Sequence, residues 1–192
     1  MPQANLDALK FLLERRSVSH KTLSFPVPDR AGIDAILTAG ARVPDHKMLE
    51  PFRFIVLGDA ALNRLGGVVQ IYGDQIGQDA DKTAKAVFNF TNAPLCIAVV
   101  ASLKPTDMIP EVEQTLAVGA CCLSVLNAAL ASGWGANWIT GWTAFETAFL
   151  QDHMGLSADE YVAGFIFIGT AKTEPTDRKR PELDAITTWV TE

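Results

Sequence analysis

A short, uninterrupted apolar run constrains the fold of this chain more than any other feature of its sequence. Residues 95–100 read Leu-Cys-Ile-Ala-Val-Val and follow directly on Pro94. Such a run suits a strand that is buried on both faces of a sheet. Between residues 116 and 130 only Ser124 and Asn127 are overtly polar, so we expect a long helix that is buried all round. Both features indicate a central sheet packed against helices.

Three further helices can be placed from local signals. Leucines at helical spacing predict an opening helix over residues 6–13. Asp29 is placed to cap a second helix, which would end at Gly40. Thr143 followed by Glu146 matches a capping box, which predicts the start of another helix.

The remaining segments alternate with these helices. Strands are expected over residues 52–57, 136–139 and 162–168. Residues 60–92 look helical, and we expect the polar part over residues 72–82 to be mobile. Because helices separate the strands, the pattern favours an α/β or α+β domain built on one central sheet.

Composition narrows the class of protein. The chain has 192 residues, a formal net charge of -6 and a sequence pI near 5.0. Nucleic-acid binding depends on clustered positive charge, so this acidic chain is a poor candidate for it. We find no apolar run as long as a membrane span, and no basic start before an apolar block that would indicate a signal peptide. We therefore expect no association with nucleic acid or membrane.

The cysteines indicate the compartment. Cys96, Cys121 and Cys122 are odd in number, and two of them are adjacent, which is no disulfide framework. All three fall in apolar segments, where inert core thiols are expected. The cysteine usage fits a reducing cytoplasm.

Standard motifs for catalysis and nucleotide binding are absent from the sequence. It contains no GxxxxGK[ST] phosphate loop, no GxGxxG fingerprint, no CxxC and no HExxH. His20, His46 and His153 are too scattered for their spacing to suggest a metal cluster, so we expect no metal site.

Basic residues instead gather at three element ends. Arg15 and Arg16 close the first helix, Arg42 and His46 lie in the next polar turn, and residues 178–180 of the tail read Arg-Lys-Arg. Guanidinium groups can grip a phosphate with paired N–H donors, about twice as strongly as a neutral hydrogen bond does. Solvated charges are the alternative, because cations are favourable at a helix C-terminus in any case. The residues alone leave both interpretations open.

An ordered series of motifs resembles the nitroreductase family. The motifs are residues 12–17 (LLERRS), 44–47 (PDHK), 50–54 (EPFRF), 92–94 (NAP), the helix from Glu113, Gly133, Trp138, and residues 164–170 (GFIFIGT). The chain is most similar to a subgroup of short members with RRS and PDHK motifs. Each motif is weak alone, but the ordered series with matching spacing covers nearly the whole chain.

The resemblance implies both a fold and an activity. It implies an α+β fold in one FMN-binding domain over residues 1–192, with a central mixed, mainly antiparallel sheet surrounded by helices. A C-terminal extension would help to form a homodimer with two FMN sites at the subunit interface. The implied activity takes electrons from NADH or NADPH and passes them to nitroaromatics, quinones or similar small acceptors by ping-pong turnover. The flavin carries the hydride at N5, so no catalytic side chain is expected.

The resemblance also implies which residues bind the cofactor. The set is Arg15, Arg16, Ser17, Arg42, His46, Trp138, Ile139, Thr140, Gly141 and Arg180. The first three would contact the ribityl-phosphate and the polar edge of the flavin, and Arg42 would reach the same cofactor. His46 would come from the partner subunit, and the segment 138–141 would line the ring. Arg180 would hold the phosphate, with Arg178 as the alternative, whereas core packing is the alternative role for Trp138.

Two departures from the family pattern keep other functions open. Many larger members have a lysine two residues after the serine of the RxS motif, close to flavin N1, where this chain has Ser19. Lys21 or an arginine would then have to supply the positive charge. The usual tryptophan after the proline is Phe52. The alternatives are a reductase of the same fold that acts on enones or dehalogenates, or a flavin-binding protein without turnover.

Overall fold

The computed structural model describes residues 3–191, and its centre is an antiparallel sheet of five strands. The strands are β1 (Leu23–Ser24), β2 (Phe52–Gly58), β3 (Leu95–Ala101), β4 (Gly135–Ile139) and β5 (Tyr161–Ala171). They are ordered β1-β5-β3-β2, and β4 also pairs with β5. The fold is therefore the expected α+β type, although every described strand pair is antiparallel, so the sheet is not mixed.

Strand β3 is the buried strand that its apolar run predicts. All seven of its residues are buried. Cys96, Ala98 and Val100 belong to one core cluster, whereas Ile97 and Val99 belong to another. Because successive side chains of a strand point to opposite faces, the sheet has a hydrophobic core on each side.

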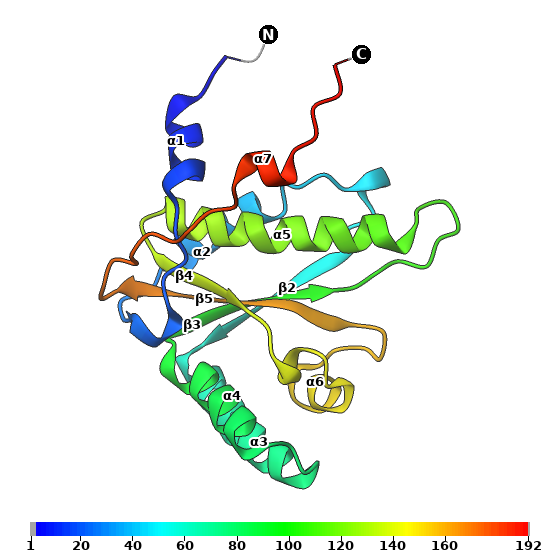
Figure 1. Ribbon diagram of the computed structural model, residues 1–192. Helices are drawn as coiled ribbons and strands as arrows, with labels where there is room; N and C mark the ends of the chain where they lie inside the picture. The colour runs from blue at the N-terminus through cyan, green and yellow to red at the C-terminus, as the bar shows by residue number, and fades with distance from the viewer. Residues whose placement is uncertain (1–2, 192) are drawn as a thin grey trace.

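Helices cover both faces of this sheet (Figure 1). One side carries α3 (Asp59–Gln75), α4 (Ala80–Asn92) and α6 (Thr147–Met154). The other carries α2 (Arg30–Gly40) and the long α5 (Glu111–Ala131). The remaining helices, α1 (Leu6–Glu14) and the short α7 (Leu183–Ile186), lie near the two ends of the described chain and contain no buried residue.

Helix α5 corrects two of our expectations. It is not buried all round: Val112, Leu116 and Leu123 are 62%, 68% and 45% exposed. Its other face packs on the sheet through residues such as Val118 and Val125. The helix is also long and apolar enough to cross a membrane by length and composition alone, contrary to our expectation that no run reaches that length. The buried face is that of a core helix, and the exposed leucines require a separate explanation.

Local capping signals were right at one helix and wrong at another. The Asp29 side chain accepts a hydrogen bond from the Gly32 amide at 2.8 Å, as an N-cap should. The capping box at residues 143–146 is not formed, because residues 142–144 make a 3-10 turn and α6 begins only at Thr147. The Glu146 carboxylate instead accepts a hydrogen bond from the Tyr72 hydroxyl at 3.1 Å. A tertiary contact has replaced the local one.

Helices α3 and α4 form a close hairpin within the segment expected to be helical, and the mobility expected for residues 72–82 stays a prediction. Helix α3 continues to Gln75, and α4 begins at Ala80, capped by Asp79, which accepts a hydrogen bond from the Lys82 amide at 2.9 Å. A Cβ atom on Gly73 would lie 2.7 Å from the Thr83 side chain, so this glycine allows the two helices to approach. The hairpin places α4 beside the sheet, where it helps to build a pocket.

Candidate cofactor site

Three arginines from the two ends of the chain meet at one corner of the molecule. Arg15 donates a hydrogen bond to the Ser17 hydroxyl at 3.0 Å. Arg16 donates to the Thr176 carbonyl oxygen and contacts the Asp177 carboxylate at 3.3 Å. Arg180 contacts the same carboxylate at 3.6 Å. The tail is therefore held against the RRS segment, and we call Arg15, Arg16 and Arg180 the arginine corner.

The arginine corner has the electrostatics of an anion site. Burial lowers the pKa of Arg15, and the positive charges of Arg180 and Arg16 lower it further. The Nε atom of Arg15 is buried and has no hydrogen-bond partner among the described residues. The Arg178 amide and the neighbouring arginines lower the pKa of Asp177, whose side chain is 86% exposed. One exposed carboxylate thus faces two of three cations, so a phosphate would be favourable here.

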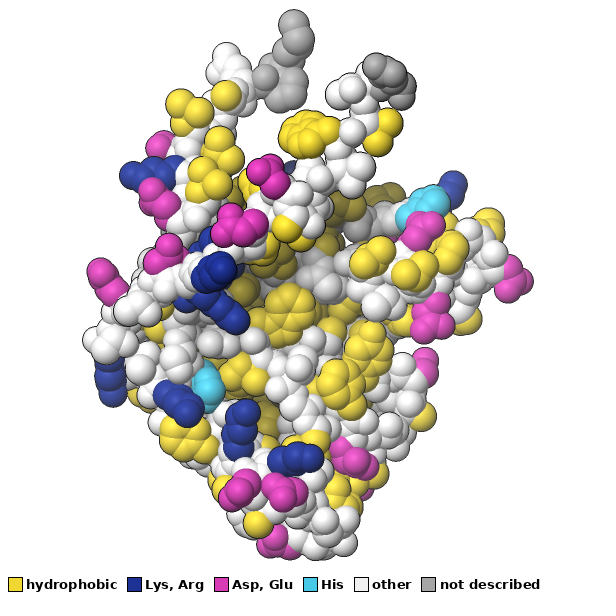
Figure 2. Space-filling model, viewed as in Figure 1, with side chains coloured by type: hydrophobic (Ala, Val, Ile, Leu, Met, Phe, Trp, Pro, Cys, Tyr) yellow, Lys and Arg dark blue, Asp and Glu magenta, His cyan; other side chains and the backbone are white. Residues whose placement is uncertain are grey.

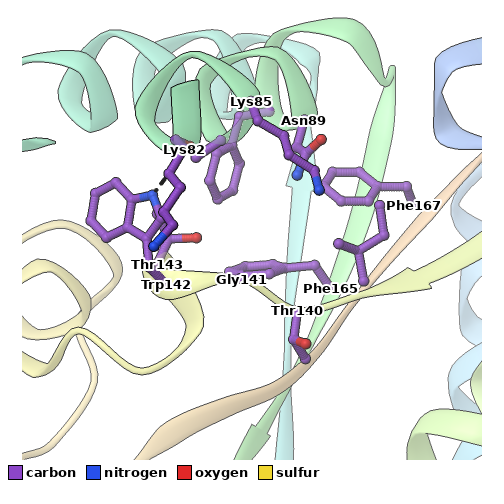
Figure 3. A pocket seen from close by; sticks show the side chains of 12 residues that line it. Lys82, Lys85, Asn89, Thr140, Gly141, Trp142, Thr143, Phe165 and Phe167 are labelled. Carbon is purple, nitrogen blue, oxygen red and sulfur yellow. Dashed lines mark hydrogen bonds between the residues drawn. The ribbon is translucent and has the colours of Figure 1, made fainter. Parts of the chain in front are cut away.

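A pocket of about 310 Å³ lies between α4 and the sheet (Figure 3). Its floor is formed by Ile139 of β4 and by Phe165 and Phe167 of β5. Thr140 and Gly141 follow β4 along one side. Helix α4 supplies the opposite wall through Lys82, Lys85 and Asn89. The pocket thus has an aromatic floor and a basic, polar wall, which is suitable for a planar anionic ligand.

The RRS segment (residues 15–17) and the residues that follow it connect the arginine corner with this pocket. The Val18 amide donates to the Ala136 carbonyl oxygen at 2.8 Å, which fixes the segment beside β4. Two residues later, the His20 ring lies 5.9 Å from the ring of Phe167 on the pocket floor. Figure 2 shows basic side chains gathered in two places on this face of the molecule, below α1 and over α4, with apolar side chains between them.

Trp138 differs from its neighbours in the segment 138–141. Its indole N–H donates to the Ala163 carbonyl oxygen at 3.2 Å. The ring covers Gly164 so closely that a Cβ atom there would lie 2.3 Å from the indole nitrogen. Side chains alternate along a strand, so Trp138 faces away from the pocket floor to which Ile139 contributes. Within the described chain, Ile139, Thr140 and Gly141 line the pocket, and Trp138 does not.

Arg42 and His46 lie apart from this pocket. Arg42 is exposed. The His46 imidazole contacts the Glu113 carboxylate through Nδ1 at 2.8 Å, beside a hollow on α5 that is also lined by Leu116. In the same turn, Lys47 has a left-handed φ of 64°, which is rare for a residue with a side chain. Neither Arg42 nor His46 lines the α4 pocket within one chain.

Sequence reasoning missed the contribution of α4 and of His20. Lys82, Lys85 and Asn89 lie at positions i, i+3 and i+7 of one helix, a spacing that places them on one face. They were overlooked because a polar stripe on an amphipathic helix is usually only its solvated side. The sequence has Ser19 where many family members have a lysine near the flavin, so another residue must supply that positive charge. Lys82 and Lys85 line the pocket, whereas Lys21 does not.

The residues described by the structure do not include a cluster of three or more histidine, cysteine or acidic side chains that could hold a metal. Burial raises the pKa of Cys121 and Cys122 to about 12 and raises that of Cys96 as well. Buried thiols with raised pKa values are typical of inert core cysteines.

The sequence model of the nitroreductase family matches residues 12–170, and the chain therefore belongs to this family. It is 33% identical over 168 residues to the protein named "Putative NAD(P)H nitroreductase YdjA" of Escherichia coli strain K12, covering 86% of this chain and 88% of the relative.

Solved structures agree in fold. A nitroreductase-like family protein from Bacillus cereus superposes with a TM-score of 0.80 at 19% identity, over 99% of this chain and 98% of that one. A variant of the FMN and NADPH-dependent nitroreductase NfnB from Sphigopyxis sp. strain HMH gives 0.73 at 18% identity, over 95% and 98%.

Proposed function

We propose that this protein is an FMN-dependent oxidoreductase that takes electrons from NADH or NADPH and passes them to a small acceptor such as a nitroaromatic or a quinone. Membership of the nitroreductase family supports the proposal, as do the names of its relatives, which include NAD(P)H nitroreductase and FMN and NADPH-dependent nitroreductase. Donor and acceptor would use one shared place in turn, which is ping-pong turnover.

The single observation that carries the proposal is the arginine corner beside an aromatic-floored pocket. Arg15, Arg16 and Arg180 would hold the FMN phosphate, and Ser17 the ribityl chain or the polar edge of the ring. The unpartnered Arg15 Nε and the cationic surroundings fit a phosphate. The ring would lie over Phe165 and Phe167, beside the backbone of Thr140 and Gly141. These groups bind and orient, while bound FMN supplies the hydride chemistry.

The second half of the site is proposed to come from a second copy of the chain. His46 lies beside the exposed apolar face of α5, and neither His46 nor Arg42 lines the pocket. In a two-fold dimer each contributed residue occurs twice, so His46 can serve the cofactor held by the other subunit. Exposed apolar side chains of α1, α5 and the tail would be covered in this homodimer: Leu9, Leu12, Leu13, Leu116, Leu123, Ile186, Trp189 and Val190.

The proposal also includes the domain organisation and the cellular compartment. Residues 1–192 would form one domain, of which residues 1, 2 and 192 lie outside the range that the structure describes. The protein would act in the cytoplasm.

An anaerobic titration tests the proposed function. The purified protein should show the visible absorbance of a flavin, and the released cofactor should be FMN. Addition of NADH or NADPH without oxygen should bleach that absorbance, and addition of a quinone should restore it. A protein that is reconstituted with FMN but is bleached by neither nicotinamide would be a flavin-binding protein and not a reductase. A protein that takes up no FMN would refute the proposal.

A further inference from the structure

Two buried polar atoms beside the α4 pocket have no hydrogen-bond partner among the described residues. They are Nε2 of His20 and Oδ1 of Asn89. The two side chains are neighbours: the polar interaction with the Asn89 side chain raises the pKa of His20, although the pair does not have the geometry of a full hydrogen bond. The Asn92 amide also ties the His20 backbone to α4, donating to its carbonyl oxygen at 2.9 Å. An unsatisfied buried polar group destabilises the folded state, so this pair requires an explanation.

His20 is held in an apolar environment. It is only 7% exposed, and its ring centroid lies 5.9 Å from Phe167 of β5 and 6.1 Å from Phe88 of α4. The charged groups that act on it are Lys21 on its own segment and Lys85 on α4. Burial lowers the pKa of His20, and the two lysines lower it further, so the resting imidazole is neutral.

The two unpartnered atoms are complementary. A neutral imidazole can carry its proton on Nε2 and donate it, whereas an amide oxygen only accepts. Asn89 also lines the pocket, and Figure 3 shows its amide nitrogen directed towards the pocket and its oxygen away from it. A small adjustment would therefore satisfy both atoms and leave an amide N–H of Asn89 free to donate into the pocket.

We propose that His20 and Asn89 act as a coupled pair that holds the polar edge of the flavin. Asn89 is the cofactor-binding residue and donates a hydrogen bond to a carbonyl oxygen of the ring. His20 is a positioning residue, which fixes the orientation of the Asn89 amide through Nε2–H and Oδ1. The inference rests on the proposed FMN function and extends it to two residues outside the RRS and 138–141 segments.

The pair would also balance the negative charge that reduction of the bound FMN adds to the pocket. Bound FMN would supply the acceptance of hydride from a nicotinamide, which would add one negative charge to the pocket. This charge favours protonation of His20, which then takes one proton from solvent on Nδ1 and becomes an imidazolium. Lys85 and Lys82 add positive charge on the same wall. Ser19 does not supply a positive charge, and His20 would supply one when the bound cofactor is reduced.

Two variants and a matched control test the pair. Asn89→Leu removes the donor in the pocket. His20→Gln can still donate to Asn89 but cannot titrate. Asn127→Leu is the control, because Asn127 of α5 also has a buried, unpartnered Oδ1 but does not line the pocket. FMN affinity is measured by titration of the apoprotein, and the midpoint potential of bound FMN from about pH 5 to pH 8, where an ordinary histidine titrates.

Asn89→Leu should weaken FMN binding by about tenfold, the value of one good hydrogen bond, whereas Asn127→Leu should leave it unchanged. His20→Gln should keep FMN affinity within about threefold of the wild type, because it keeps a neutral hydrogen bond. It should also reduce the dependence of the midpoint potential on pH. The inference is overturned if Asn89→Leu binds FMN like the control, or if His20→Gln keeps the wild-type pH dependence. A wild-type protein that binds no FMN would instead refute the proposed function itself.

Discussion

The two faces of the sheet are incomplete in different ways. On the α4 side, buried polar atoms such as His20 Nε2 and Asn89 Oδ1 lack partners beside a pocket. On the α5 side, the core is closed, but Leu116 and Leu123 point outwards and are 68% and 45% exposed. In the proposed pair, the two atoms satisfy each other and leave an Asn89 N–H free for a ligand, whereas an exposed apolar helix face is satisfied by another protein surface. Under the proposed function, the α4 face would hold the cofactor and the α5 face would meet a second subunit.

The positions of the family motifs follow this division. Residues 139–141 line the pocket on the α4 side, and the RRS segment leads to β4 through the Val18 amide, whereas the PDHK turn lies beside α5. A site that uses both sets can be complete only where two copies meet. Substitutions on each face should therefore have separable effects on cofactor binding and on dimerisation.

The largest effect is expected from the arginine corner. The double change Arg15→Ala and Arg16→Ala should weaken FMN binding at least about 100-fold, because each charge-assisted hydrogen bond is worth roughly 1.5–3 kcal/mol. Titration of the apoprotein with FMN measures this loss. Arg30→Ala is the matched control, since Arg30 forms an exposed pair with Asp34 within α2. Unchanged affinity in the double variant, with an intact fold by circular dichroism, would remove the phosphate from this corner.

The next effect concerns the subunit face. Leu116→Glu should weaken dimerisation about 100-fold or more, because a carboxylate would be buried without a partner in an apolar interface. Sedimentation equilibrium measures the dimer dissociation constant. Ile71→Glu is the control, since Ile71 of α3 is similarly exposed, at 61%, on the opposite side of the sheet. A wild-type protein that is monomeric with FMN bound would contradict the assignment of the α5 face.

The sequence predicted the fold well where local chemistry decides the outcome. The apolar run of β3 needs burial on both sides, and Asp29 caps α2 whatever surrounds it. The prediction failed where a distant contact competes with a local one. The Glu146 carboxylate accepts a hydrogen bond from the Tyr72 hydroxyl and not from the backbone N–H of Thr143, as a capping box would require. The expected burial of α5 on all sides was also wrong. The sequence pattern of an apolar helix is the same whether its residues face the core or another protein surface.

The site was predictable only in part for a related reason. Arg15 and Arg16 are adjacent in the sequence and carry a recognisable motif, but their meeting with Arg180 depends on the path of the tail. Asn89 and His20 are 69 positions apart and become neighbours only because α4 packs against the 3-10 turn that begins at His20. A polar residue on one helix face gives no sign that it faces a pocket.

A smaller effect should show that the two faces serve one site. We expect His46→Ala to reduce activity, about tenfold if one hydrogen bond to the cofactor is lost. When it is mixed with the Arg15→Ala, Arg16→Ala variant, one site of the heterodimer carries both lesions and the other carries none. Activity should therefore recover towards half that of the wild-type dimer. A verified heterodimer that stays at the average of its parents would mean that His46 serves its own chain or is not needed.

The smallest effect is expected from a substitution of Asp177. This substitution tests whether the Asp177 carboxylate occupies the phosphate position of the arginine corner when no cofactor is bound. Its carboxylate contacts Arg16 and Arg180 at 3.3 and 3.6 Å, where the phosphate would bind, so it must move aside or compete. Asp177→Asn should therefore strengthen FMN binding, by only about threefold because exposed ion pairs are weak and screened by salt. The Asp177 side chain is exposed, and the Arg178 amide and the two arginines lower its pKa. The carboxylate should therefore be charged and compete with the phosphate at neutral pH. The competition should disappear only when acid protonates the carboxylate. Titrations with FMN at low and high salt measure the effect, and Asp184→Asn in α7 is the control. Weaker binding in Asp177→Asn would show that Asp177 orders the arginines for the phosphate and does not compete with it.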